Sequence, residues 1–265
     1  PDELPDCSTP RQYLINYMDI FIKSLEFNKM IDVILFTDQD FNVDLPNLII
    51  YKTSFEEIKR RIQTKFEFEI CLNKPYKLCD YKVAYGYIFD EELKKYEFWG
   101  YCDLDEVLGD IMNFFNDDIF EKYEKIYQHG HLSLYKNTPE NNTRFMLQGG
   151  MNYKKVFTTD VICVFDEVIG IQNKYDLLGI NTYKSRDCAD ILPWHDKFLR
   201  AESYLSKEEK INFNYKYQVF FWENGKVYRA ALKNNKIIYD EFNYLHFQKR
   251  NLTKHFENID KLNSF

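Results

Sequence analysis

Short apolar segments alternate with a helix-forming segment early in the chain, and this alternation restricts the possible folds most strongly. Residues 31–38 (IDVILFTD) and 47–53 (NLIIYKT) are apolar runs with the length of strands. Ser54, followed three residues later by Glu57, forms a capping box that predicts a helix beginning at Phe55. Strands that alternate with helices are typical of βαβ units and a parallel sheet. The chain is therefore expected to have an α/β fold.

The two ends of the chain carry different patterns. Near the start, five apolar residues have the spacing of one buried helix face: Leu14, Tyr17, Met18, Phe21 and Leu25. In residues 217–234, Asn224 and Gly225 separate two β-rich runs, which predicts a hairpin. We expect a single domain over residues 1–265, with a mixed, mainly parallel sheet flanked by helices and a C-terminal β-hairpin region.

Composition disfavours several classes of protein. The formal net charge is −7, so a nucleic-acid-binding surface and a nucleic-acid partner are not expected. Six cysteines show no C-x-x-C spacing, which favours a reducing, cytoplasmic compartment over a zinc site or disulfide framework. No run approaches the roughly 18 apolar residues of a membrane span, and no signal peptide is visible.

Two aspartates directly follow the apolar, aromatic run 96–102 (YEFWGYC). Strands of α/β proteins present ligand-binding groups at their carboxyl ends, and two carboxylates one residue apart can share a hard cation. Three interpretations of Asp103 and Asp105 compete: an ordinary turn with a helix cap, the nucleophile pair of a haloacid dehalogenase-like phosphohydrolase, and the metal-binding D-x-D of a GT-A glycosyltransferase. The long α/β pattern upstream of Asp103 disfavours the phosphohydrolase, which carries its pair on its first strand.

A candidate third ligand lies near the end of the chain. His246 ends an apolar run, and Lys249 and Arg250 follow it. A neutral imidazole can complete the coordination of Mn²⁺, and the two cations can bind diphosphate oxygens. Alone, such a histidine is more often structural and such a basic pair is more often a solvated turn. Together with the aspartates, they predict that Asp103, Asp105 and His246 bind a divalent cation, Mn²⁺ or Mg²⁺.

Five segments resemble a family of bacterial glycosyltransferases of GT-A type that are encoded in capsule and lipopolysaccharide gene clusters: KPYKLCDYKVAYG (74–86), FWGYCDLDEVLGDI (98–111), HLSLYKN (131–137), FDE (165–167) and YLHFQKR (244–250). The resemblance extends roughly from Tyr13 to Arg250. It implies a GT-A-like (Rossmann-like) fold and a nucleotide-sugar donor, with a UDP-sugar preferred. It also implies a glycan or lipid-linked glycan acceptor in surface polysaccharide biosynthesis, met at the inner face of the cell membrane.

The same resemblance assigns roles to single residues. In GT-A enzymes the second aspartate of the pair more often ligates the ion while the first can reach the ribose, which here are Asp105 and Asp103. Asp38 is expected near the nucleoside, and Asp80 and Lys82 near the donor. A strand-end turn explains Asp38 equally well, and a helix cap explains Asp80 almost as well.

An inverting transferase needs a general base, and an inverting hexosyltransferase is the expected enzyme. Asp166 is the preferred candidate and Glu167 the second, because an apolar run ends at both. Acidic residues at the start of a helix would give the same pattern, and a retaining enzyme would need no such base.

Other features have weaker signals. Trp194, His195 and Asp196 could contact an acceptor sugar, although packing of Trp194 is the commoner outcome, and His129 and His131 are assigned to a strand at residues 127–137. Residues 1–13 do not resemble the opening strand of a GT-A enzyme, so that strand either lies upstream or has diverged. A metal-dependent phosphohydrolase and a non-catalytic glycan-binding module remain the alternative functions.

Overall fold

The computed structural model describes residues 10–185, 187–191, 197–201 and 213–250, with only the backbone for residues 10–16. Contacts divide the chain into two compact units, which are described separately. Unit 1 comprises residues 1–32, 103–116 and 185–265, and unit 2 comprises residues 33–102 and 117–184. The single domain over residues 1–265 stays a prediction beside this division.

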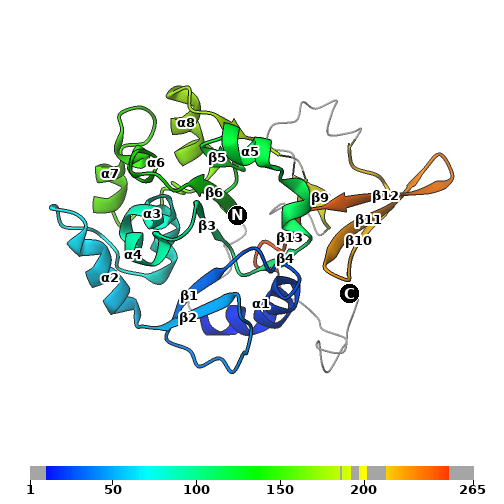
Figure 1. Ribbon diagram of the computed structural model, residues 1–265, viewed down its shortest axis with the longest axis horizontal. Helices are drawn as coiled ribbons and strands as arrows, with labels where there is room; N and C mark the ends of the chain where they lie inside the picture. The colour runs from blue at the N-terminus through cyan, green and yellow to red at the C-terminus, as the bar shows by residue number, and fades with distance from the viewer. Residues whose placement is uncertain (1–9, 186, 192–196, 202–212, 251–265) are drawn as a thin grey trace, which may run out of the picture. The chain divides into compact units, whose positions relative to one another are not determined.

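Unit 2 begins with the parallel strand pair predicted from the sequence, β1 (Val33–Thr37) and β2 (Leu48–Lys52). Helix α2 (Phe55–Thr64) follows (Figure 1). The capping box forms as expected, because the Ser54 hydroxyl accepts the Glu57 N–H and the Glu57 carboxylate accepts the Ser54 N–H at 2.7 Å. The turn chemistry of two residues therefore fixes where α2 begins.

A second sheet of unit 2 has the order β3-β6-β5-β7. Its strands are β3 (Phe98–Cys102), β5 (Lys125–Ile126), β6 (Leu132–Lys136) and β7 (Thr182–Tyr183). The helical segments of unit 2 after α2 are η1 (Pro75–Ala84), α3 (Tyr85–Ile88), α4 (Asp90–Leu93), α5 (Asp117–Lys122), α6 (Pro139–Asn142), η3 (Arg144–Met146), α7 (Tyr153–Thr158), η4 (Val168–Gln172) and α8 (Asn173–Leu177). Aromatic rings dominate the core between them, such as Tyr81 stacked on Phe157 with ring centroids 4.2 Å apart.

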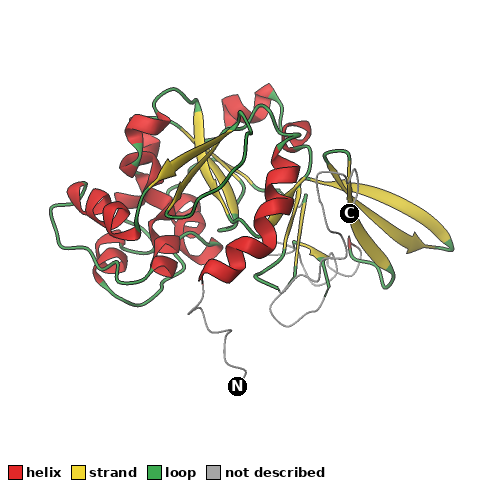
Figure 2. Cartoon of the chain, turned by 90° about the horizontal axis from the view of Figure 1, so that it is seen from below, coloured by secondary structure: helices red, strands yellow, loops and turns green. Residues whose placement is uncertain are grey.

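Unit 1 contains two sheets, with strand orders β4-β13-β8-β9 and β10-β11-β12. Strands β10, β11 and β12 are labelled in Figure 1, and Figure 2 draws the strands in yellow. Its elements are α1 (Pro10–Leu25), β4 (Glu106–Leu108), η2 (Ile111–Phe114), β8 (Cys188–Asp190), β9 (Leu199–Arg200), β10 (Gln218–Glu223), β11 (Lys226–Lys233), β12 (Lys236–Phe242) and β13 (Tyr244–His246). The predicted hairpin joins β10 to β11, and its turn residues Asn224 and Gly225 have φ angles of 50° and 83°. This left-handed geometry is the one that Asn-Gly turns favour.

Helix α1 packs on the four-stranded sheet of unit 1, as its predicted apolar face requires. Tyr17 and Ile20 lie in one buried cluster with Val107, Leu245 and other apolar residues. Polar contacts fix the same interface, because the Ser24 hydroxyl accepts the Leu108 N–H at 3.0 Å. This packing holds β4 and β13 in place, and these are the strands that lead to the predicted metal ligands.

The mixed α/β class is confirmed, but the expectation of a mainly parallel sheet is wrong for the described residues. Parallel pairing occurs in β1–β2, β5–β7 and β8–β13, and the other strand pairs are antiparallel. Short connections explain the difference, because a tight turn such as the one after β10 can join only antiparallel neighbours. The GT-A-like topology remains a prediction.

The strand predicted over residues 127–137 is shorter than expected. Tyr127 has a φ of 68°, which ends β5, and β6 begins only at Leu132. His129 and His131 therefore lie in the connection before β6, which corrects their assignment to a strand. Their rings stack on each other with centroids 4.8 Å apart.

Candidate metal centre

Strand β13 places His246 beside acidic residues of both neighbouring strands. It pairs antiparallel with β4, where His246 lies opposite Glu106, and parallel with β8, where His246 lies opposite Asp190. Directly opposed residues of paired strands point to the same face of a sheet, and successive residues alternate. Leu245 lies in the core cluster, so His246 projects from the opposite face together with Asp190.

The three predicted ligands, Asp103, Asp105 and His246, lie close together on this face of the sheet. Asp103 and Asp105 lie in the bend before β4. The Nε2 atom of His246 lies 3.6 Å from Oδ1 of Asp105 and 3.8 Å from Oδ2 of Asp103. One atom of each side chain lies within 4.8 Å of the others. Carboxylate oxygens suit Mn²⁺ and Mg²⁺, and a neutral imidazole can complete the coordination of Mn²⁺, so the residues present fit the expected cation, with Mn²⁺ preferred.

Backbone N–H groups of the segment after β13 fix the position of Asp105. The Lys249 N–H donates to Oδ2 of Asp105 at 2.6 Å, and the Phe247 N–H donates to the Asp105 carbonyl at 2.9 Å. Gln248 and Lys249 both have left-handed backbone conformations, with φ angles of 50° and 57°. Non-glycine residues adopt this region at a cost, and here it directs the Lys249 N–H toward the carboxylate.

His246 is held on its other side by Asp190, a residue that the sequence did not indicate. Its Nδ1 atom lies 3.0 Å from Oδ1 of Asp190, and Oδ2 of the same carboxylate accepts a 3.4 Å hydrogen bond from the Gln248 side chain. Asp190 ends β8, a three-residue strand in a region without clear periodicity. The only local signal in the sequence is an aspartate directly after Cys188 and Ala189, and such a short pattern is too common to identify a site.

These contacts shift the pKa values of His246 and Asp105 in opposite directions. Burial lowers the pKa of His246, but hydrogen bonds and the charges of Asp105 and Asp190 outweigh it and hold the pKa well above its usual value. Burial raises the pKa of Asp105, and the interactions with His246 and the Lys249 N–H outweigh it, so this pKa is lowered. Both shifts favour a protonated His246 ring beside ionised carboxylates, and a cation that binds at Nε2 would have to displace the proton there.

A family model described as "Family of unknown function (DUF6625)" matches residues 13–265. The chain belongs to this family. Comparisons with curated proteins and with solved structures found no match. Because DUF6625 has no assigned activity, the resemblance to glycosyltransferases stays a prediction.

The two cations that were expected to bind the diphosphate, Lys249 and Arg250, follow closely after His246 in the sequence. Lys249 and Arg250 are half-buried, and the Arg250 N–H donates to the Phe247 carbonyl at 3.0 Å, which closes the turn after β13. Lys249 thus contributes its backbone to the centre in this structure. The binding of diphosphate by the two side chains stays a prediction.

The predicted donor-binding residues of unit 2 have different surroundings. Asp38 is exposed after β1, and its carboxylate accepts a 2.5 Å hydrogen bond from the Gln39 side chain. Asp80 is fully buried, and it accepts hydrogen bonds from Lys77 at 2.6 Å, from the Cys163 N–H at 2.9 Å and from the Phe165 N–H at 2.8 Å. In the structure, Asp80 therefore holds the segment that precedes Asp166. Its contact with the donor stays a prediction.

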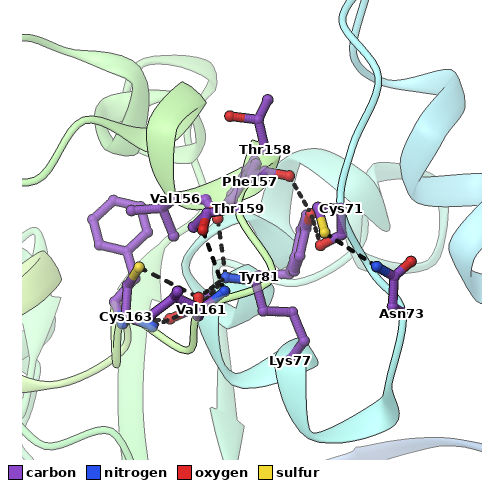
Figure 3. Close-up of polar contacts among 12 residues, drawn as sticks. Cys71, Asn73, Lys77, Tyr81, Val156, Phe157, Thr158, Thr159, Val161 and Cys163 are labelled. Atoms are coloured by element: carbon purple, nitrogen blue, oxygen red, sulfur yellow. Dashed lines mark hydrogen bonds and ion pairs between the residues drawn. The ribbon is translucent and has the colours of Figure 1, made fainter.

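Lys77 extends the same network on the other side of Asp80. Its ammonium group also donates to the carbonyls of Val156 at 3.0 Å and Val161 at 2.5 Å. Figure 3 shows Lys77 reaching these carbonyls, with the Tyr81 hydroxyl bonded to the Phe157 carbonyl nearby. These contacts fix the course of the chain from α7 to Asp166.

The two candidate bases and Lys82 come together around Gly130 in unit 2. Lys82 Nζ lies 3.1 Å from Oδ2 of Asp166 and donates to the Gly130 carbonyl at 3.0 Å, while the Gly130 N–H donates to Glu167 at 3.2 Å. A Cβ atom at Gly130 would lie 2.7 Å from the Glu167 carboxylate, so a larger residue here would displace that side chain. The sequence named Lys82, Asp166 and Glu167, but only the fold shows that they are neighbours.

Two other predictions concern the chain beyond these centres. Trp194, His195 and Asp196 lie outside the described residues. Among the residues that the structure describes, no helix has the length and apolar character needed to cross a membrane.

Proposed function

We propose that this DUF6625 chain is a metal-dependent glycosyltransferase with a GT-A-like fold. It transfers a hexose from a nucleotide sugar, by preference a UDP-sugar, to a glycan or lipid-linked glycan of a surface polysaccharide. It works in the cytoplasm, at the inner face of the cell membrane. The observation that carries this proposal is the convergence of Asp103 and Asp105 with His246, a residue 141 positions beyond Asp105 that was expected as a ligand together with them.

The roles of the centre follow from its donor atoms. Asp105 and His246 hold the cation, and Asp103, which is the more exposed carboxylate at 30% side-chain exposure, also reaches the donor. A divalent cation bound here neutralises the charge that builds on the departing diphosphate. Lys249 and Arg250 contribute further positive charge to diphosphate oxygens.

Acid–base chemistry is assigned to unit 2. Asp166 removes the proton from the acceptor hydroxyl in an inverting reaction. The ion pair with Lys82 orients its carboxylate, and the Asp80 network holds the backbone immediately before it. Glu167 is the second candidate, with an orientation fixed by the Gly130 N–H.

The test is the binding of UDP and of GDP, with and without Mn²⁺, measured by isothermal titration calorimetry. Wild type is compared with Asp105→Ala and with the control Asp110→Ala, which removes a carboxylate from the same unit, outside the centre. Metal-dependent UDP binding that only Asp105→Ala abolishes is the expected result. Release of phosphate from phosphate esters would instead support a phosphohydrolase, and sugar binding that is indifferent to Mn²⁺ and to Asp105 would support a glycan-binding module.

A further inference from the structure

We propose that Asp190 is a positioning residue of the metal centre, which holds the His246 ring so that Nε2 faces Asp103 and Asp105. The inference rests on the proposed function insofar as it assumes that the centre binds a divalent cation. It adds Asp190 to the centre and gives this residue a role, orienting the His246 ring, that neither the sequence pattern nor the family assigns.

Nδ1 and Nε2 lie on different sides of the imidazole ring, and each has a defined neighbour. Asp190 Oδ1 lies 3.0 Å from Nδ1, whereas the aspartate oxygens of the D-x-D pair lie 3.6 and 3.8 Å from Nε2. The shorter contact has hydrogen-bond length, and the longer ones leave room for an ion between the donor atoms. The proton at Nδ1 is therefore held by Asp190, and Nε2 is the nitrogen available as a ligand.

Asp190 is itself held in place by its strand and by Gln248. Its backbone is in register with His246 in the parallel pair β8–β13, and its side chain is buried with 8% of the residue exposed. Gln248 donates to its second oxygen, Oδ2, at 3.4 Å. A carboxylate bonded at both oxygens has little freedom to rotate, so it can fix the orientation of the ring.

Asp105 is supported in the same way as His246. Oδ2 of Asp105 accepts the Lys249 N–H at 2.6 Å, which leaves Oδ1 directed at Nε2 of His246. In both Asp105 and His246, one polar atom is hydrogen-bonded within the protein, and the other faces the position where a cation would lie. Histidine ligands of metals commonly donate their second nitrogen to a carboxylate in this way, and loss of that partner typically weakens metal affinity by about 10–100-fold.

The experiment measures Mn²⁺ binding by isothermal titration calorimetry to wild type, Asp190→Ala, Asp190→Asn and Asp187→Asn. Asp187 is the matched control, because it is an aspartate of the same segment that contacts Ser185 and Arg200 rather than His246. The isosteric Asp190→Asn keeps the test decisive if Asp190→Ala fails to fold. We expect both Asp190 variants to bind Mn²⁺ about 10–100-fold more weakly, with unchanged circular dichroism, and Asp187→Asn to bind like wild type.

A second readout reports on the ring directly. In protein loaded with Mg²⁺, the ¹⁵N shifts of the His246 imidazole show which nitrogen carries the proton, and His246→Gln assigns these signals among the five histidines. Wild type should show a proton at Nδ1. In Asp190→Asn the amide can donate to Nδ1, so a fraction of the rings should carry the proton at Nε2 instead.

Two negative results would have different meanings, one for the role of Asp190 and one for the metal centre as a whole. If Mn²⁺ binds to wild type, depends on Asp105, and binds equally well to Asp190→Asn with an unchanged ring tautomer, the inference about Asp190 is overturned and the metal centre stands. If wild type binds no Mn²⁺, the metal centre itself is overturned, and the inference falls with it.

Discussion

The Lys249 backbone N–H donates to Oδ2 of Asp105 at 2.6 Å, although 144 positions separate the two residues. This bond ties the turn after the last described strand to the D-x-D bend. It depends on the left-handed conformations of Gln248 and Lys249. The position of a central carboxylate is thus set by the backbone of Lys249, a residue that the sequence predicted to act through its side chain at the diphosphate.

Substitution at position 249 should separate the role of its backbone from that of its side chain. Lys249→Pro removes the N–H and cannot adopt a φ of 57°, so we expect weaker Mn²⁺ binding and a free energy of unfolding lowered by more than about 1 kcal/mol. Lys249→Ala keeps the N–H and should leave Mn²⁺ affinity unchanged while weakening UDP binding. Calorimetry with each ligand, together with urea unfolding, measures both effects. Equal Mn²⁺ affinity in the two variants would contradict the assigned backbone role.

Loss of Asp80 should primarily affect stability. Asp80→Ala leaves the buried Lys77 ammonium without its carboxylate and removes the acceptor for the N–H groups of Cys163 and Phe165. Breaking a buried ion pair in this way lowers the free energy of unfolding by about 3–5 kcal/mol. The exposed pair of Lys65 and Asp90 provides the control, because Asp90→Ala should cost at most about 1 kcal/mol. Urea unfolding that shows no difference between the two variants would contradict the structural role of Asp80.

The buried Lys125 predicts a specific dependence of stability on pH. Burial lowers the pKa of its ammonium group to about 7, whereas an unfolded lysine titrates near about 10.4. Between these values the unfolded chain binds more protons than the folded chain, so the contribution of Lys125 to the free energy of unfolding rises with pH, by at most about 1.4 kcal/mol per pH unit. Below pH 7 the contribution is constant.

Comparison with Lys125→Met isolates this contribution from the other titrating groups. The free energy of unfolding of wild type minus that of the variant should be flat below about pH 7 and rise from pH 7 to 10. Lys125 also donates to the Tyr127 carbonyl, Ser133 and Gln172, which adds an offset that is independent of pH. A flat difference across the whole range would show that Lys125 keeps its ordinary pKa.

Separate substitutions of the two candidate bases should identify which one acts. If Asp166 is the base, Asp166→Asn should lower the rate of sugar transfer by about 100–10,000-fold, while Mn²⁺-dependent UDP binding stays at the wild-type value. Glu167→Gln is nearly isosteric and serves as the matched comparison. Transfer is measured as UDP release that depends on acceptor. A larger loss in Glu167→Gln would reverse the assignment, and wild-type rates in both would exclude both residues as bases.

The sequence alone was enough for features that depend on neighbouring residues. The capping box at Ser54 and the Asn224–Gly225 turn are set by local hydrogen bonding and backbone preference, and they form as predicted. Periodicity predicted the apolar face of α1, of which Tyr17, Met18, Phe21 and Leu25 are buried. The D-x-D pair and His246 were also identifiable, because an apolar run that ends in a polar residue marks a strand end.

Only the tertiary structure decided which of these residues work together. Asp190 joins His246 through the register of two parallel strands that lie 56 positions apart, and no local pattern encodes that register. The same applies to Asp80, whose carboxylate is used by N–H groups more than 80 positions away. Strand pairing and burial are properties of the whole chain, because they depend on which surfaces the packing brings together.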